Sequence, residues 1–188
     1  MKCLSSMPYN MRSAFDKQKL VYPPLPIYSL FTYEKGALIQ LLIHKLKYKG
    51  RKDIGLFFGQ LLGDRLKAVG VDFDFIVPVP LSRLRFLKRE YNQSVIISEG
   101  ISTVLKVPIL KGLIGRRRSH SSQTKLDVWS RWLNTEEHFY AYNNNKLPNG
   151  AVVLFVDDVL TTGATLQSCV SPVVDKLKAV YACTVAAV

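Results

Sequence analysis

Residues 152–165, V-V-L-F-V-D-D-V-L-T-T-G-A-T, constrain the fold of this chain more than any other stretch. Its first five residues are all apolar, three of them valine, which is typical of a strand buried on both faces of a parallel sheet. Asp157 and Asp158 are then expected to end that strand. Ligands of open α/β sheets bind beyond the carboxyl ends of the strands, so these two carboxylates stand where a ligand is expected.

The residues after the acidic pair predict a phosphate-binding turn. Thr161, Thr162, Gly163, Ala164 and Thr165 are small, mostly hydroxylated and followed by a predicted helix. Backbone N–H groups of such a turn can close around a phosphate, helped by the positive end of the helix dipole. The neighbouring carboxylates suit sugar hydroxyls or a hard cation. An ordinary strand followed by an Asx-type turn and a threonine cap is the plainer alternative.

The rest of the chain alternates predicted strands and helices, which favours an α/β fold with a parallel sheet. Residue type and apolar spacing predict further strands over 27–33, 75–81 and 179–188, and helices over 37–48, 54–69 and around 95–101. Pro78 and Pro80 should mark the carboxyl end of their strand, because proline cannot donate to a ladder. Pro172 should break the helix that follows Thr165.

Basic residues outnumber acidic ones, 26 to 14, giving a formal net charge of +12 that favours anionic partners. Residues 45–53 are strongly basic and predict either a phosphate or nucleic-acid contact or a solvated helix end, with equal weight. A second basic segment follows the strand over 75–81. It predicts pyrophosphate binding in preference to a merely exposed turn, and its cations are Arg83, Arg85, Lys88 and Arg89.

Residues 107–140 are expected to form a hood-like insertion. Arg116, Arg117 and Arg118 open a segment without apolar period, which predicts a mobile loop. His120 lies in this segment. It is expected to be a solvated side chain more often than a general acid or base, although its ordinary pKa would suit that role.

These motifs resemble those of a known family. The acidic pair and its turn resemble the phosphoribosyl pyrophosphate (PRPP) motif of type I phosphoribosyltransferases, and the rest of the pattern, over about residues 27–188, resembles the competence protein F (ComF) family. The shared positions are Leu46, Lys47, Tyr48, Gly50 and Gly55; Pro78 to Leu81; Tyr91, Asn92 and Gln93; and Arg118, Gln123, Thr124, Leu126, Arg131 and Asn134. One departure is Glu90, where relatives commonly carry glycine.

The resemblance implies a three-layer parallel sheet with a small hood and an N-terminal extension. It further implies that Asp157 and Asp158 bind the ribose hydroxyls, that residues 161–165 bind the 5′-phosphate, and that the loop with Arg118, Gln123 and Thr124 closes over PRPP. The implied activity is transfer of a phosphoribosyl group to an amine or base, with Mg²⁺ that arrives with PRPP and is not fixed by the protein alone. The alternative is an accessory protein of competence and DNA uptake, which binds single-stranded DNA or a helicase-like partner without turnover.

Cysteine content and hydropathy give the remaining expectations. Cys3, Cys169 and Cys183 are too few and too widely spaced for a zinc ribbon, so no zinc is expected, although many family members carry one. No apolar run approaches the about 20 residues that span a bilayer, and no signal peptide is evident, so a cytoplasmic protein without membrane partners is expected. Residues 1–26 are expected to form an extended arm before a single domain over residues 27–188.

Overall fold

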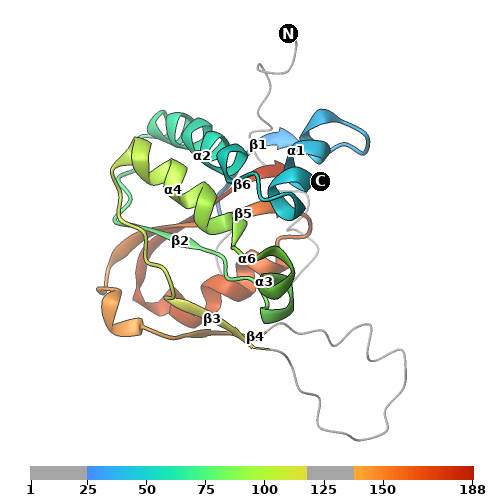
Figure 1. Ribbon diagram of the computed structural model, residues 1–188. Helices are drawn as coiled ribbons and strands as arrows, with labels where there is room; N and C mark the ends of the chain where they lie inside the picture. The colour runs from blue at the N-terminus through green and yellow to red at the C-terminus, as the bar shows by residue number, and fades with distance from the viewer. Residues whose placement is uncertain (1–24, 118–137) are drawn as a thin grey trace, which may run out of the picture.

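A computed structural model describes residues 25–117 and 138–188 of the chain. At its centre is a sheet of four parallel strands in the order β1-β6-β5-β2 (Figure 1). The strands are β1 (Ile27–Thr32), β6 (Leu177–Ala187), β5 (Ala151–Leu160) and β2 (Phe75–Pro78). The predicted α/β class with a parallel sheet is therefore confirmed.

Helices cover both faces of this sheet and give it three layers. One face packs against α1 (Leu38–Tyr48), α2 (Lys52–Lys67) and α4 (Gln93–Leu105), and the other against α6 (Ala164–Val170) and the 3-10 helix η2 (Ser171–Lys176). Leu154 and Val156 belong to the first core, whereas Val153 and Phe155 belong to the second. All four are 0% exposed, as the unbroken apolar run predicts for a central strand.

A row of glycines lets α2 and α4 run side by side at close range (Figure 1). Gly55, Gly59 and Gly63 recur every fourth residue and so lie on one face of α2. A Cβ on Gly59 would lie 2.7 Å from the Cα of Gly100 and would also collide with the carbonyl oxygen of Ile97. The backbones of the two helices therefore touch with no side chain between them.

Two predictions about the strand ends have different outcomes. β2 ends at Pro78, as the prolines predict, and the last β2–β5 pair is Pro78 with Val156. The prediction that Asp157 and Asp158 end the central strand is wrong, because β5 continues to Leu160. The reason is its other neighbour: β6 runs on alongside, pairing Asp157 with Thr184 and Leu160 with Ala187. The acidic pair thus lies inside β5 but just past the end of β2.

Two basic segments form regular secondary structure. The basic segment after β2 forms the short helix α3 (Arg83–Arg89). The prediction of a mobile loop is wrong for Arg116 and Arg117, which belong to β3 (Ile114–Arg117), paired antiparallel with β4 (His138–Ala141). A backbone ladder needs no apolar period, which is why the arginine run concealed this strand.

The other elements agree with the sequence. Pro172 lies where α6 gives way to η2, and the segment before β5 contains the short η1 (Asn144–Lys146). No helix within residues 25–117 and 138–188 is both long and apolar enough to cross a bilayer. Most of the predicted N-terminal arm, Arg118 and residues 119–134 with His120 lie outside the described residues.

Candidate ligand-binding site at the carboxyl edge of β5

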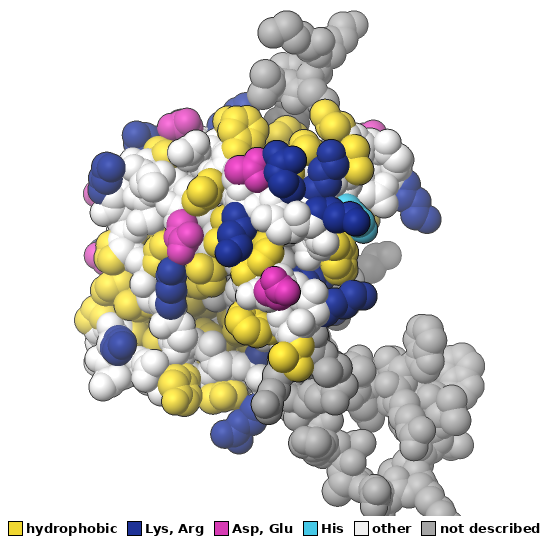
Figure 2. Space-filling model, in the orientation of Figure 1, with side chains coloured by type: hydrophobic (Ala, Val, Ile, Leu, Met, Phe, Trp, Pro, Cys, Tyr) yellow, Lys and Arg dark blue, Asp and Glu magenta, His cyan; other side chains and the backbone are white. Residues whose placement is uncertain are grey.

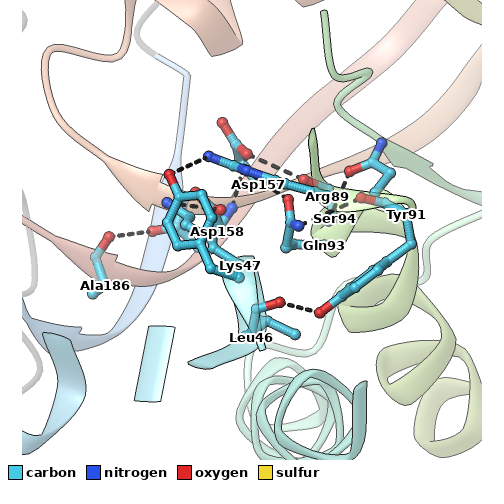
Figure 3. A network of polar contacts seen from close by, with 12 residues as sticks. Leu46, Lys47, Arg89, Tyr91, Gln93, Ser94, Asp157, Asp158 and Ala186 are labelled. Carbon is cyan, nitrogen blue, oxygen red and sulfur yellow. Dashed lines mark hydrogen bonds and ion pairs between the residues drawn. The ribbon is translucent and has the colours of Figure 1, made fainter. Parts of the chain in front are cut away.

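Asp157 and Asp158 are held by partners from two helices (Figure 3). Oδ1 of Asp157 accepts hydrogen bonds from the Ser94 hydroxyl at 3.1 Å and from the backbone N–H of Asp158 at 2.8 Å. Oδ2 of Asp158 forms an ion pair with the Lys47 ammonium at 2.9 Å. Helix α1 thus supplies a cation and α4 a hydroxyl to the same two adjacent carboxylates.

The environment of Asp157 shifts the pKa of its carboxyl group. Burial raises the pKa of Asp157 to about 7, and the charge of Asp158 acts in the same direction. The hydrogen bonds from the Asp158 N–H and from Ser94, and the charge of Lys47, oppose this shift. Asp157 can therefore change its protonation state near neutral pH while hydrogen bonds hold it in place.

The Tyr91-Asn92-Gln93 motif organises this edge of the sheet. The Tyr91 hydroxyl donates to the carbonyl oxygen of Leu46 at the end of α1. The Asn92 side chain caps α4 by accepting from the Ser94 N–H at 3.0 Å, and it donates to the Val79 carbonyl at 2.9 Å. Because the motif ties α1, α4 and the segment after β2 together, its role in the structure is to position the neighbouring polar groups.

Two cations of α3, Lys88 and Arg89, lie around Tyr48. Arg89 donates to the buried Gln93 side chain at 2.8 Å and to the Tyr48 hydroxyl at 3.3 Å. The Arg89 guanidinium and the Lys88 ammonium lie 5.1 and 5.5 Å from the Tyr48 ring centre. The hydrogen bond from Arg89 lowers the pKa of Tyr48, and the charges of Arg89, Lys47 and Lys88 lower it further, against the opposing effect of burial.

The turn predicted to bind phosphate connects β5 to α6. Gly163 has φ 80°, a left-handed conformation that glycine adopts without strain, and it precedes the first residue of α6. The Ala164 N–H donates to the Thr162 hydroxyl at 3.4 Å. This weak contact is of the kind expected from the alternative interpretation, in which a threonine merely caps the helix. No described group accepts a hydrogen bond from the N–H groups of Thr161, Thr162 or Gly163. These donors are available to a ligand.

The predicted site residues have different outcomes. Asp157 and Asp158 lie one short step along the chain from residues 161–165. Arg89 reaches Tyr48 and Gln93, and Lys88 lies over Tyr48 from an exposed position of α3. Arg85 is exposed, and Arg83 is the first residue of the helix. Arg118, Gln123 and Thr124 lie outside the described residues, so their predicted role is untested. No three His, Cys, Asp or Glu side chains gather as metal ligands within the described ranges.

Three contributors to this edge were not predicted as site residues. Lys47 was noted only as part of the basic run and the family motif, and Ser94 follows the family motif directly. Arg116 was assigned to a loop, yet it donates to the Pro80 carbonyl at 3.0 Å and lies over the Phe139 ring at 5.2 Å. One sequence signal could have identified Lys47 as a site residue. It follows Leu46, a buried residue, near the end of an amphipathic helix.

Comparison with known proteins identifies relatives by sequence. Competence protein F of Haemophilus influenzae is 38% identical over 93 residues, which are 49% of this chain and 40% of that protein. DNA utilization protein YhgH of Escherichia coli O157:H7 is 31% identical over 134 residues, 68% of this chain and 57% of that protein. Competence protein ComFC of Bacillus subtilis is 27% identical over 152 residues, 80% of this chain and 59% of that protein.

Solved structures match at lower similarity. Glutamine PRPP amidotransferase from B. subtilis has a TM-score of 0.49 at 16% identity, covering 75% of this chain and 30% of that one. Adenine phosphoribosyltransferase from Leishmania donovani has a TM-score of 0.46 at 12% identity, covering 84% of this chain and 83% of that one. No protein-family model matches the chain. The chain spans about half the length of these curated relatives (40–59%), and over that span it is a homologue of the competence protein F family, with ComFC and YhgH among its relatives.

Proposed function

We propose that this protein binds PRPP at the carboxyl edge of β5 and transfers its phosphoribosyl group to an amine or base. One observation carries the proposal: the acidic pair and a turn with available N–H donors follow one another on the same strand end. Asp157 and Asp158 each have one engaged oxygen, and no described residue donates to the other. A remaining oxygen on each of two consecutive carboxylates suits the two adjacent hydroxyls of a ribose.

The rest of the ligand follows from this placement. With the ribose on the acidic pair, its 5′-phosphate would reach the turn at residues 161–165, whose N–H groups suit an anion. The pyrophosphate would point toward the cations of α3, Arg89 among them. The protein's contribution would be to position PRPP and to neutralise the departing pyrophosphate. Mg²⁺ that comes with the pyrophosphate would help its departure in the transfer step, and binding itself would not depend on the ion.

Titration calorimetry with PRPP tests this proposal. Wild-type protein is expected to bind, and Asp157→Asn with Asp158→Asn is expected to weaken binding by at least tenfold. Loss of a charge-assisted hydrogen bond costs about 1.5–3 kcal/mol, which makes even one such loss measurable. Asp64→Asn on the exposed face of α2 removes the same charge away from the edge and should bind as wild type does. Unchanged PRPP affinity in the double variant would show that Asp157 and Asp158 do not bind the ribose.

A second candidate is a role in competence and DNA uptake without turnover. Two observations favour it: the names of the relatives, and the Lys and Arg side chains that gather over α1 and α3 (Figure 2). The tyrosines of this surface already have cations near their rings, however. Arg89 and Lys88 lie over Tyr48, and the Lys52 ammonium lies 5.1 Å from the Tyr91 ring centre. Charge therefore supports this candidate more than aromatic stacking does.

The salt dependence of oligonucleotide binding tests the second candidate. For single strands, log K against log salt should slope by about −0.7 per phosphate contact. Replacing the exposed Lys49 and Lys52 with glutamine should flatten that slope by about one contact each while PRPP binding persists. Absence of single-stranded DNA binding at low salt would remove DNA binding from this candidate and leave only a protein partner.

A further inference from the structure

The ion pair between Lys47 and Asp158 is a fixed feature of the acidic edge. The two side chains are only 19% and 13% exposed, and the nitrogen–oxygen distance is 2.9 Å. The residue before Lys47 is held on both sides: the Leu46 side chain is 0% exposed, and the Leu46 carbonyl accepts from Tyr91. The ammonium therefore approaches Asp158 from a backbone that cannot easily move away.

A Mg²⁺ ion shared by the two carboxylates does not fit this arrangement. Mg²⁺ demands a near-ideal octahedron of oxygens at about 2.0–2.1 Å. One oxygen of Asp157 is already engaged by Ser94 and by the Asp158 N–H, and one oxygen of Asp158 is engaged by Lys47. An ion on the remaining oxygens would lie close to the Lys47 ammonium at high electrostatic cost, because both carry positive charge.

The hydroxyl groups of a sugar do fit. They are neutral donors, so they can use the remaining oxygen of each carboxylate without displacing the cation. An ammonium has three N–H donors, and the ion pair with Asp158 uses only part of them. The remaining donors can contact an anionic group of the same ligand.

We propose that Lys47 is a specificity-determining residue that takes the place of a divalent cation beside Asp158, so that a ribose-phosphate ligand binds this edge without Mg²⁺. The inference rests on the proposed function, since it concerns the same PRPP site. It differs from that function in one respect that can be measured separately, namely whether binding needs a divalent cation.

Calorimetry with PRPP in EDTA and in Mg²⁺ tests the inference. Wild-type protein is expected to have dissociation constants within about threefold of each other in the two buffers. Lys47→Met is expected to bind at least tenfold more weakly in EDTA and to recover most of that loss in Mg²⁺, because the ion can then occupy the vacated position. Lys49→Met removes the same charge at an exposed position two residues away, and it should match wild type in both buffers.

Two results would overturn the role of Lys47. One is wild-type binding that requires Mg²⁺, which needs no variant and so does not depend on the folding of Lys47→Met. The other is unchanged affinity of a folded Lys47→Met protein in EDTA, with folding checked by its melting curve. Absence of PRPP binding in both buffers would instead overturn the proposed function and this inference with it.

Discussion

The hydroxyl of Ser94 donates to Oδ1 of Asp157 at 3.1 Å and so ties the first turn of α4 to the acidic pair on β5. The bond favours the ionised carboxylate, whereas burial and the charge of Asp158 favour the protonated one and raise the pKa of Asp157 to about 7. Stability and ligand binding at this edge therefore depend on pH in a range where few carboxylates titrate.

The first prediction concerns that dependence. A folded-state pKa above the unfolded value of about 3.9 means that the folded protein holds the proton more tightly. The free energy of unfolding should therefore fall as pH rises from about 4 to about 7 and stay level above. Asp157→Asn carries no charge, so it should be more stable than wild type at pH 8, by about 1–2 kcal/mol once solvent screening is allowed for, and equal to it near pH 4.

Thermal melts at pH 8 and at the lowest pH where both proteins stay folded check this. At pH 8 the melting temperature of Asp157→Asn should exceed that of wild type by about 2–8 °C, and the gap should shrink at low pH. A gap of the same size at every pH would mean that the substitution acts through packing and that Asp157 does not titrate as stated.

The second prediction concerns Glu90, which ends α3 with φ 65°. This left-handed conformation costs a residue with a Cβ about 1–2 kcal/mol, which explains why glycine suits the position. Glu90→Gly should therefore be more stable than Glu90→Ala by about 1 kcal/mol in urea denaturation. The same pair at Glu99, inside α4, should show the opposite order, because alanine is the better helix former there. Equal stability of both Glu90 variants would argue against the strain.

The third prediction concerns the contact between α2 and α4. Gly59→Ala should destabilise the protein by about 2–3 kcal/mol, although alanine favours helices, because the new methyl collides with the backbone of Ile97 and Gly100. Gln60→Ala, one residue away and exposed, should stay within about 0.5 kcal/mol of wild type. A Gly59→Ala protein as stable as wild type in chemical denaturation would show that the helices can separate without cost.

The fourth prediction concerns Tyr48. Arg89→Met removes the hydrogen bond and the nearest charge that favour the tyrosinate, so the pKa of Tyr48 should rise toward its ordinary value. Ultraviolet titration of each protein against its Tyr48→Phe counterpart isolates this residue among the tyrosines. Arg85→Met, at an exposed position of the same helix, should leave the titration almost unchanged. A downward shift in Arg89→Met would contradict the assignment.

Local pattern was sufficient to predict the central strand and its acidic pair. Residues 153–156 are all apolar, so the strand has no polar face to turn toward solvent and is buried on both sides. Pro78 ends β2 because proline cannot donate a hydrogen bond to the ladder. Both properties depend on the residues themselves. The α/β class followed from the same local patterns repeated along the chain.

Long-range partners decided what the sequence could not predict. β5 passes the acidic pair because β6, a strand from the end of the chain, remains paired with it. Lys47 reaches Asp158 only because the fold brings the end of α1 to β5, and in the sequence it is one more cation of a basic run. Arg117 belongs to a strand because its partner, His138, comes back from a distant part of the sequence.

The pairing of Arg117 with His138 also determines how the stability of the protein depends on the length of the connection between them. Arg117 and His138 are opposite each other in the antiparallel ladder, so the two ends of the connection between them, residues 118–137, are fixed at a strand-pair distance. The entropic cost of closing a connection grows only slowly with its length, by about 0.6 kcal/mol for each doubling. The β3–β4 ladder can therefore tolerate connections of very different length at little cost in stability, while the sheet and its acidic edge keep their geometry.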